Sequence, residues 1–382
     1  MFDDVTIEQL RARGSVKWSA FPDAIGAFIA EMDFGTAPAV TDAVNDALAR
    51  NQFGYLPEGF KAGLGEAYAN FAGGRYGVEV DPELVRPVVD VVEGLIAVIN
   101  HFTTPGSPVI VPTPAYMPFL TVGEVVGREI VQVPLVHDGD RYVYDLDALS
   151  RAFTVPGQLL VLCNPHNPIG RVLEAEELRA IAEVVEAHGG VVYSDEIHAP
   201  ITYPGHDHVP YAAVSEAAAR HSITGTSTSK AWNVPGLKAA QLVFSNSDHF
   251  DQWRAFGRRY EQVASTIGVL AATAAYTRGE GWLDDVVEYL NANRTALTSL
   301  VPEHLPGAGY SEPEGTFLAW LDVRDLDLPG RAADFFLQHA NVATTAGEDC
   351  GAPGFVRLNF ATPAPILSEV VRAMGEAVAI HS

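Results

Sequence analysis

The chain has 382 residues, of which 48% are hydrophobic, and this length is enough for two or three domains with a full hydrophobic core. Its formal net charge of −24 is typical of a solubilising surface and disfavours nonspecific nucleic-acid binding, and no apolar run reaches the ~20 residues of a membrane helix. Residues 1–5 do not resemble a signal peptide, and two cysteines, Cys163 and Cys350, form neither a disulfide framework nor a clustered metal site, so we expect a cytoplasmic protein.

The first predicted element is a helix over residues 38–49, where Pro38 suits a first-turn position. Between about residues 87 and 245, short β-branched runs alternate with helical stretches such as 95–102 and 174–188. The predicted strands are residues 87–92, 109–111, 159–162, 191–193, 221–224 and 241–244. This alternation predicts an α/β fold with a doubly wound sheet of buried, mainly parallel strands.

The chain changes character after the helical stretch that covers about residues 247–300. Strands are predicted at 316–321 and 355–359, and helices at 331–339 and 366–380, which indicates a smaller α+β domain. We expect the N-terminal segment to complete that domain. The predicted division is a large domain over residues 46–285 and a small domain made of residues 1–45 with 286–382.

The loops that follow the strands hold the candidate functional residues, because ligands bind at the carboxyl ends of strands in open α/β sheets. Gly94 and Leu95 follow the first strand at an expected helix start, where free N–H groups favour a phosphate, although a simple turn is an alternative. Tyr116 follows the second strand and could stack on a planar ring or lie in the core.

Two further loops carry polar residues. Asn167 lies in Asn164-Pro165-His166-Asn167-Pro168, where two Asn-Pro steps restrict the backbone and prepare its amide to donate to a phenolate oxygen. Asp195 ends a buried strand, where a carboxylate needs a partner. A protonated pyridine nitrogen is one such partner, and a helix N-cap role is the alternative.

Lys230 is conspicuous because the chain has only four lysines, Lys17, Lys61, Lys230 and Lys238. It follows a strand and the hydroxyl residues Ser227-Thr228-Ser229. A lysine amine can form a Schiff base with an aldehyde, which arginine cannot do, and the hydroxyls can hold a phosphate. An aldehyde that carries a phosphate is pyridoxal 5′-phosphate. Lys238 is the other candidate amine, but it lacks the strand end and the flanking hydroxyls.

With these loops in this order, the chain resembles the fold-type I pyridoxal-phosphate enzymes of the aspartate aminotransferase superfamily over essentially its whole length. Several motifs are similar to the cystathionine β-lyase, or C–S lyase, branch: Lys17-Trp18 and residues 30–34, 53–55, 163–170, 194–198, 229–233 and 315–322.

The resemblance implies a role for each matching residue. Lys230 would form the Schiff base, Asp195 would pair with the pyridine nitrogen, and Asn167 would bind the phenolate oxygen. Tyr116 would stack on the ring, and Arg357 would clamp the substrate carboxylate through a bidentate pair. A salt-bridging strand residue is the alternative for Arg357.

The implied phosphate ligands are Gly94, Leu95 and Ser227. Tyr55 would reach the phosphate of the neighbouring subunit's cofactor, which implies a homodimer with shared active sites.

Two positions depart from the aminotransferase pattern. His198 stands where aminotransferases usually carry a tyrosine that contacts the phenolate oxygen, which favours the lyase branch. Lys238 stands where many aminotransferases have a phosphate-binding arginine, so it is either a phosphate contact or a solvated lysine.

The lyase branch implies α,β-elimination of L-cystathionine, or of a related cysteine S-conjugate, to a thiol, pyruvate and ammonia. That activity would belong to sulfur amino acid metabolism and methionine biosynthesis. The alternatives are a class I/II aminotransferase on the same fold and a regulatory protein that binds the cofactor without turnover. A metal-dependent hydrolase is disfavoured, since His206-Asp207-His208 reads as a surface loop rather than a metal site.

Overall fold

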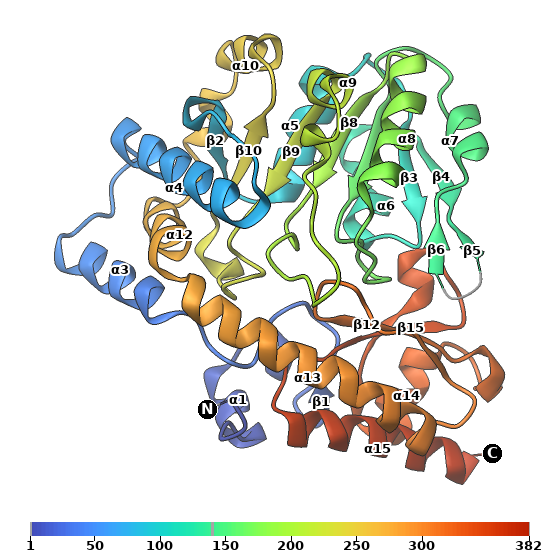
Figure 1. Ribbon diagram of the computed structural model, residues 1–382. Coiled ribbons are helices and arrows are strands. Elements are labelled where there is room, and N and C mark those ends of the chain that lie inside the picture. The colour runs from blue at the N-terminus through green and yellow to red at the C-terminus, as the bar shows by residue number, and fades with distance from the viewer. Residues whose placement is uncertain (1, 139–140, 382) are drawn as a thin grey trace.

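The computed structural model describes residues 2–138 and 141–381, and it contains two principal sheets, a large one above a smaller one (Figure 1). The large sheet has seven strands in the order β2-β10-β9-β8-β7-β3-β4. These strands are β2 (Val85–Val88), β3 (Val109–Thr113), β4 (Ile130–Pro134), β7 (Leu159–Cys163), β8 (Val191–Asp195), β9 (Ser222–Thr226) and β10 (Ala240–Phe244).

The predicted mainly parallel, doubly wound sheet is confirmed. Strands β9, β8, β7, β3 and β4 are mutually parallel, and only β10 runs antiparallel to its neighbours β9 and β2. The five residues of β7 and the five of β8 are all buried, which is why these strands are continuous apolar runs rather than alternating ones.

Helices cover both faces of the large sheet. One apolar core lies between the sheet and α5 (Val91–Phe102), α6 (Met117–Val126) and α10 (Ser247–Arg254). The core on the opposite face includes residues of α7 (Leu146–Ala152), α8 (Ala175–Ala187) and α9 (Glu216–His221). Helices α4 (Glu58–Tyr76), α11 (Arg258–Glu261) and α12 (Thr266–Arg278) lie at the β2 and β10 side of the sheet (Figure 1).

The predicted strand over residues 87–92 is wrong at its end. β2 stops at Val88, and α5 already begins at Val91 rather than near Leu95. Asp90 is its N-cap, with Oδ1 accepting the Glu93 N–H at 2.9 Å. The cap favours a helix here, and the β-branched Val91, which suggested a strand, packs into the core instead.

The small sheet is antiparallel, in the order β11-β12-β15-β14. It is built from β11 (Gly309–Tyr310), β12 (Leu318–Asp322), β14 (Thr345–Ala346) and β15 (Phe355–Asn359), with helices α13 (Glu280–His304), α14 (Ala332–Ala340) and α15 (Ala364–His381) beside it. In Figure 1, α13 runs from the large part of the molecule into the small part, so the predicted boundary at residue 285 falls inside a helix.

The N-terminal segment joins the C-terminal part through its strand and its core. It contains α1 (Ile7–Arg13), α2 (Val16–Ser19), β1 (Ile25–Gly26) and α3 (Pro38–Ala49), and β1 pairs in parallel with β13 (Val342–Ala343). Leu10 and Trp18 share one core with Leu358 and Val370. The remaining hairpin, β5 (Val136–Asp138) with β6 (Arg141–Val143), projects from the large part toward the small sheet. Among the described residues, no helix has both the length and the apolar character that a membrane span requires.

Candidate active site

The carboxyl ends of the parallel strands bring the predicted functional loops to one edge of the large sheet. Cys163 of β7 stands opposite Asp195 of β8, and Asp195 stands opposite Gly225 of β9. The loop that carries Asn167 follows β7, and the loop that carries Lys230 follows β9. The small sheet faces this edge from below (Figure 1).

Lys230 reaches from its loop to the N-terminal segment, where Nζ donates to the backbone oxygen of Ala30 at 2.9 Å. Burial, reinforced by the nearby Arg357 guanidinium, lowers the pKa of Lys230 to about 8. A large share of this amine is therefore neutral slightly above neutral pH, as a nucleophile or a proton acceptor requires.

Asp195 is buried at the end of β8, and its Oδ1 accepts the Ile197 N–H at 3.2 Å. It therefore caps a local turn and not a helix. Burial raises the pKa of Asp195 to about 7, although the Ile197 N–H and the Lys230 charge act in the opposite direction. A carboxyl so poorly compensated can accept a strong cationic partner. A protonated pyridine nitrogen fits this requirement.

Arg357, on β15, lies buried across the site from Lys230 and contacts Asn167 directly. Its Nη1 donates to Asn167 Oδ1 at 3.0 Å, and its Nη2 donates to Phe28 O at 3.0 Å and Thr345 Oγ1 at 3.2 Å. Its Nε is buried with no hydrogen-bond partner in the described part of the chain. One donor of this guanidinium is thus available for an anionic ligand such as a carboxylate.

Asn167 is left with its Nδ2 as a donor, because Arg357 occupies its Oδ1. The described residues provide no protein partner for that nitrogen. The side chain is buried at the predicted place, so it can donate to an oxygen of a bound ring.

Tyr116 is the N-cap residue of α6, in the loop that follows β3. Its ring packs edge-on against Phe119, with centroids 5.4 Å apart, at the margin of the core. Burial raises the pKa of the Tyr116 hydroxyl, while the charge of Arg357 lowers it and that of Asp195 raises it. Tyr116 thus borders both the core and the site.

His198 lies buried beside the site, with its ring 5.7 Å from that of Phe317. Burial, together with the Lys230 and Arg357 charges, holds the pKa of His198 well below its usual range, so the imidazole is neutral. Its Nδ1 has no hydrogen-bond partner within the described ranges. A buried polar atom without a partner is one that a ligand can satisfy.

The predicted phosphate contacts need a correction. Gly94 already donates its N–H to Asp90 O at 3.0 Å, because α5 begins one turn earlier than expected. Leu95 lies deeper in the same helix. The first-turn N–H groups that lack an intrahelical acceptor and are not used by the Asp90 cap are those of Val91 and Val92.

The other predicted phosphate residues lie near this helix start. Lys238 Nζ contacts Asp90 Oδ2 at 3.0 Å, with more than half of the lysine side chain exposed. Ser227 Oγ donates to Ala239 O at 2.8 Å and accepts the Ser229 N–H at 3.0 Å, so its hydroxyl holds the loop together. The start of α5, Lys238 and the serine loop thus lie together, and the first-turn N–H groups of α5 can donate to a phosphate there, while Lys238 is paired with Asp90.

Tyr55 is not brought to the site within one chain. It is 92% exposed, two positions after the exposed Phe53. A tyrosine left this open is compatible with a contact made by a second subunit, and that contact stays a prediction.

The sequence motif at residues 30–34 turned out to line the site, a role that had not been assigned to it. Asn233 binds this segment through both Met32 backbone groups, and Asn359 Nδ2 donates to Ile29 O and Glu31 O at 2.6 and 2.7 Å. Two asparagines from opposite parts of the chain thereby hold the segment over Lys230. The polar and charged residues in this part of the sequence were the signal that could have indicated this role.

The expected surface loop at His206-Asp207-His208 is partly wrong. His208 is buried, and its Nε2 lies 3.1 Å from Glu196 Oε2 because that carboxylate is itself buried and needs partners. Within the described ranges, no cluster of histidine, cysteine, aspartate or glutamate has the arrangement of a metal site.

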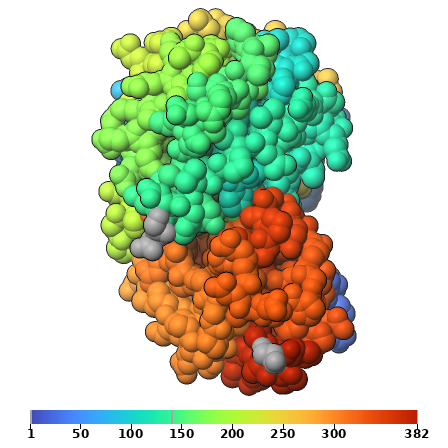
Figure 2. Space-filling view, turned by 90° about the vertical axis from the view of Figure 1, so that its right-hand side faces the viewer, coloured from blue at the N-terminus to red at the C-terminus, as the bar shows by residue number. Residues whose placement is uncertain are grey.

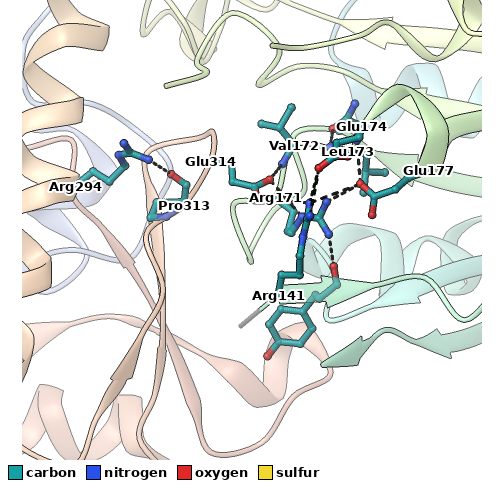
Figure 3. A network of polar contacts seen from close by, with 11 residues as sticks. Arg141, Arg171, Val172, Leu173, Glu174, Glu177, Arg294, Pro313 and Glu314 are labelled. Atoms are coloured by element: carbon teal, nitrogen blue, oxygen red, sulfur yellow. Dashed lines mark hydrogen bonds and ion pairs between the residues drawn. The ribbon is translucent and has the colours of Figure 1, made fainter. Parts of the chain in front are cut away.

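A cavity of about 510 Å³ separates the large and small parts beside the Asn167 loop. Figure 2 shows the hollow between the green upper half and the orange lower half of this face. Gly170 and Arg171 line it on one side, and Glu314 and Trp320 on the other. Of these residues, Arg171 and Glu314 belong to a polar network that the sequence did not predict (Figure 3).

Comparison with known proteins gives consistent matches over the whole chain. The family model for class I and II aminotransferases matches residues 26–374. A cystathionine beta-lyase from Corynebacterium glutamicum is 38% identical over 370 residues, covering 96% of this chain and 97% of that protein. The cystathionine beta-lyase PatB from Bacillus subtilis is 31% identical, with 95% and 96% covered. Among solved structures, a candidate PLP-dependent beta-cystathionase from Corynebacterium diphtheriae superposes with a TM-score of 0.93 at 38% identity, covering 99% of each chain.

Proposed function

Because the chain belongs to the class I and II aminotransferase family and has the fold of fold-type I PLP-dependent enzymes, we propose that it is a pyridoxal-phosphate-dependent carbon–sulfur β-lyase. The proposed reaction is α,β-elimination of L-cystathionine, or of a related cysteine S-conjugate, to a thiol, pyruvate and ammonia. The observation that carries the proposal is the pair formed by the partly buried Lys230 and the buried Asp195, close enough that each shifts the other's pKa. The lyase names of the relatives supply the reaction class.

The residues present fit pyridoxal phosphate. The amine of Lys230 would hold the aldehyde, Asp195 would hold the ring nitrogen, and Asn167 and His198 offer polar atoms for the ring oxygen. Tyr116 would lie on the ring. When bound, the cofactor supplies an electron-withdrawing ring that takes up negative charge from the substrate Cα.

Side chains of the protein itself would bind the substrate carboxylate and accept the proton from Cα. The buried Arg357 guanidinium binds the α-carboxylate and so fixes the orientation of Cα. Lys230, with its pKa at about 8, accepts the Cα proton as a general base. Asp195 keeps its negative charge once a cationic nitrogen lies beside it, since the attraction lowers its pKa.

The phosphate would lie at the first turn of α5, where the Val91 and Val92 N–H groups are available and the Lys238 ammonium, paired with Asp90, lies nearby. This location replaces the one proposed from Gly94 and Leu95. We also infer a cytoplasmic homodimer in which Tyr55 acts across the interface. Release of homocysteine from cystathionine would assign the enzyme to sulfur amino acid metabolism and methionine biosynthesis.

The first test is to mix the purified, cofactor-loaded protein with L-cystathionine without any 2-oxo acid. Pyruvate and free thiol should then appear in equal amounts while the visible absorbance persists. Lys230→Ala should lower turnover by at least about 10²- to 10⁴-fold, because the general base is lost.

An aminotransferase would behave differently in the same cuvette. Its colour would bleach without pyruvate and return when a 2-oxo acid is added. A protein that binds the cofactor but leaves cystathionine and other S-conjugates unchanged would be the regulatory protein instead. A protein that stays colourless with added cofactor would contradict the role of Lys230.

A further inference from the structure

The connection between β11 and β12 reaches from the small sheet into the large part of the molecule. We call its residues 313–317 the strap. Its backbone lies between the loop after β7 and the loop after β8, which carry Asn167 and His198. The backbone hydrogen bonds between the strap and these loops include Glu314 N and Gly315 N to Gly170 O at 2.8 and 2.9 Å, Thr316 N to Ile201 O at 3.0 Å, and Tyr203 N to Glu314 O at 3.1 Å.

The Glu314 carboxylate fixes the strap to the loop after β7. Its Oε2 accepts the Val172 N–H at 2.8 Å and the Arg171 Nε–H at 3.2 Å, and the side chain is only 17% exposed. Arg171 is itself immobilised by Glu177 Oε2 at 2.6 Å and by the backbone oxygen of Tyr142 (Figure 3). Residues 170–172 are therefore bound by the strap through both backbone and side chain.

The strap packs so closely against the two loops that there is no room for a side chain at either of two glycines. A Cβ added to Gly170 would lie 2.3 Å from Pro313 Cβ, and one added to Gly315 would lie 2.9 Å from Ile201 O. Gly170 also donates its N–H to His166 O at 2.7 Å, so it closes the turn that contains Asn167. A displacement of the strap is thus transmitted to Asn167.

The strap also ends beside the second loop of the site. Phe317 is fully buried, and its ring lies 5.7 Å from that of His198. The strap therefore contacts the supports of both Asn167 and His198. From these contacts we propose that Glu314 is a positioning residue, which sets the placement of Asn167 and His198 toward the ring oxygen of a bound cofactor without touching the ligand itself.

This proposal rests on the proposed function, since Asn167 and His198 need a placement only if they face a cofactor. A purely structural role for Glu314 predicts something different. Loss of the ion pair would then lower stability alone, and the behaviour of a bound cofactor would not change.

The test compares Glu314→Gln and Glu314→Ala with Glu312→Gln as the matched control. Glu312 lies on the same connection and contacts Arg294 at 3.7 Å, but it makes no contact with residues 170–172. Hydrogen–deuterium exchange of the segment 166–173 is measured on the cofactor-free proteins. The pH midpoint of the visible absorbance change is measured on the proteins loaded with pyridoxal phosphate.

In both Glu314 variants we expect the Val172 amide to exchange about tenfold faster, because it loses a charged acceptor. The absorbance midpoint should rise by about one pH unit, because the ring oxygen loses a well-placed donor for its ionised form. Glu312→Gln should match the wild type in both measurements.

Three outcomes would overturn the proposal: wild-type exchange in the Glu314 variants, an unshifted midpoint, or a Glu314→Gln protein that does not fold, which would make Glu314 a residue of the fold alone. Failure of cofactor binding is distinct, since the wild-type protein itself would then show no visible band, and failure of the lyase reaction alone is detected by the cystathionine assay.

Discussion

At the scale of single residues, Asp195 is buried and Lys230 is partly buried, and the pKa values of both groups move toward neutrality. Burial raises the pKa of Asp195 to about 7 and lowers that of Lys230 to about 8. Each group would be more stable in water in its charged form, so the site lowers the stability of the cofactor-free chain. Such a site is expected where a ligand supplies the missing partners.

Asp195→Asn should stabilise the cofactor-free protein at pH 8 but not at pH 4. Between its ordinary pKa of 3.8 and its folded value of about 7, Asp195 binds more protons in the folded chain than in the unfolded chain. The free energy of unfolding therefore falls as pH rises through this window, and asparagine removes that loss. We expect a gain of about 1 to 3 kcal/mol at pH 8, measured by thermal unfolding at several pH values.

The exposed Asp207→Asn serves as the control and should change stability at neither pH. Equal stabilisation by Asp195→Asn at pH 4 and pH 8 would show that the effect is not linked to ionisation. Asparagine retains the oxygen that accepts the Ile197 N–H, so the local turn is kept.

The sequence predicted candidate site residues where the chemistry of the side chain does not depend on partners far away in the chain. Lys230, Asp195 and Asn167 could be selected because an amine, a carboxylate and an amide each followed a predicted strand. The burial of His208 could not be predicted, because it depends on the Glu196 carboxylate 12 positions earlier in the chain. The contacts of Arg357 with Phe28 and Asn167 likewise depend on tertiary structure.

At the scale of elements, Glu261 joins three segments near the edge of the large sheet. Its carboxylate accepts from Lys61 of α4 at 2.8 Å, from Arg86 of β2 at 2.7 and 2.8 Å, and from the Trp253 indole of α10 at 2.9 Å. Burial alone would raise the pKa of Glu261, but these hydrogen bonds lower it to about 2.

Glu261→Gln should lower the free energy of unfolding by about 3 kcal/mol at pH 7, because it leaves the buried Lys61 without its main partner. The folded pKa of Glu261 is depressed, so this contribution is present above its ordinary pKa of 4.5 and is lost as pH falls toward 2. Urea unfolding at pH 7 and pH 3 measures both effects.

Glu58→Gln is the matched control, since Glu58 also contacts Lys61, at 2.7 Å, but its side chain is 77% exposed. We expect it to cost no more than about 0.5 kcal/mol. A Glu58 effect as large as that of Glu261 would mean that burial does not decide the strength of this network.

Helices and strands could be predicted where the local sequence pattern favoured a single kind of secondary structure. Residues 38–49 and 355–359 match α3 and β15 as predicted. Helix α4 was not predicted, because five glycines dilute its apolar periodicity and its stability comes from packing against α12. The start of α5 was misplaced because Val91 and Val92 favour a strand locally, whereas the Asp90 cap and the core favour a helix.

At the scale of the whole molecule, the predicted homodimer can be tested by complementation. Lys230→Ala and Tyr55→Ala proteins should each be inactive or strongly impaired. If Tyr55 completes the neighbouring subunit's site, a mixed dimer has one site with both defects and one site with neither. Subunit exchange between the two proteins should then recover about a quarter of the wild-type sites.

No recovery after exchange, confirmed by mass measurement of the mixed dimers, would show that Tyr55 acts within its own chain or has no role. The 92% exposure of Tyr55 and the neighbouring exposed Phe53 favour the shared site. The sequence alone could suggest this interface only through the family resemblance, since nothing in the local pattern distinguishes it from an ordinary loop.

The segment over Lys230 has a consequence for how this protein is compared with others. Its contacts to Lys230, Asn233 and Asn359 are made by the backbone groups of Ala30, Met32, Ile29 and Glu31. Every amino acid offers the same backbone carbonyl, so a change of side chain at these positions does not by itself remove the contacts. The path of the chain, more than the side chains at these four positions, therefore supplies the contacts that hold the N-terminal segment over Lys230.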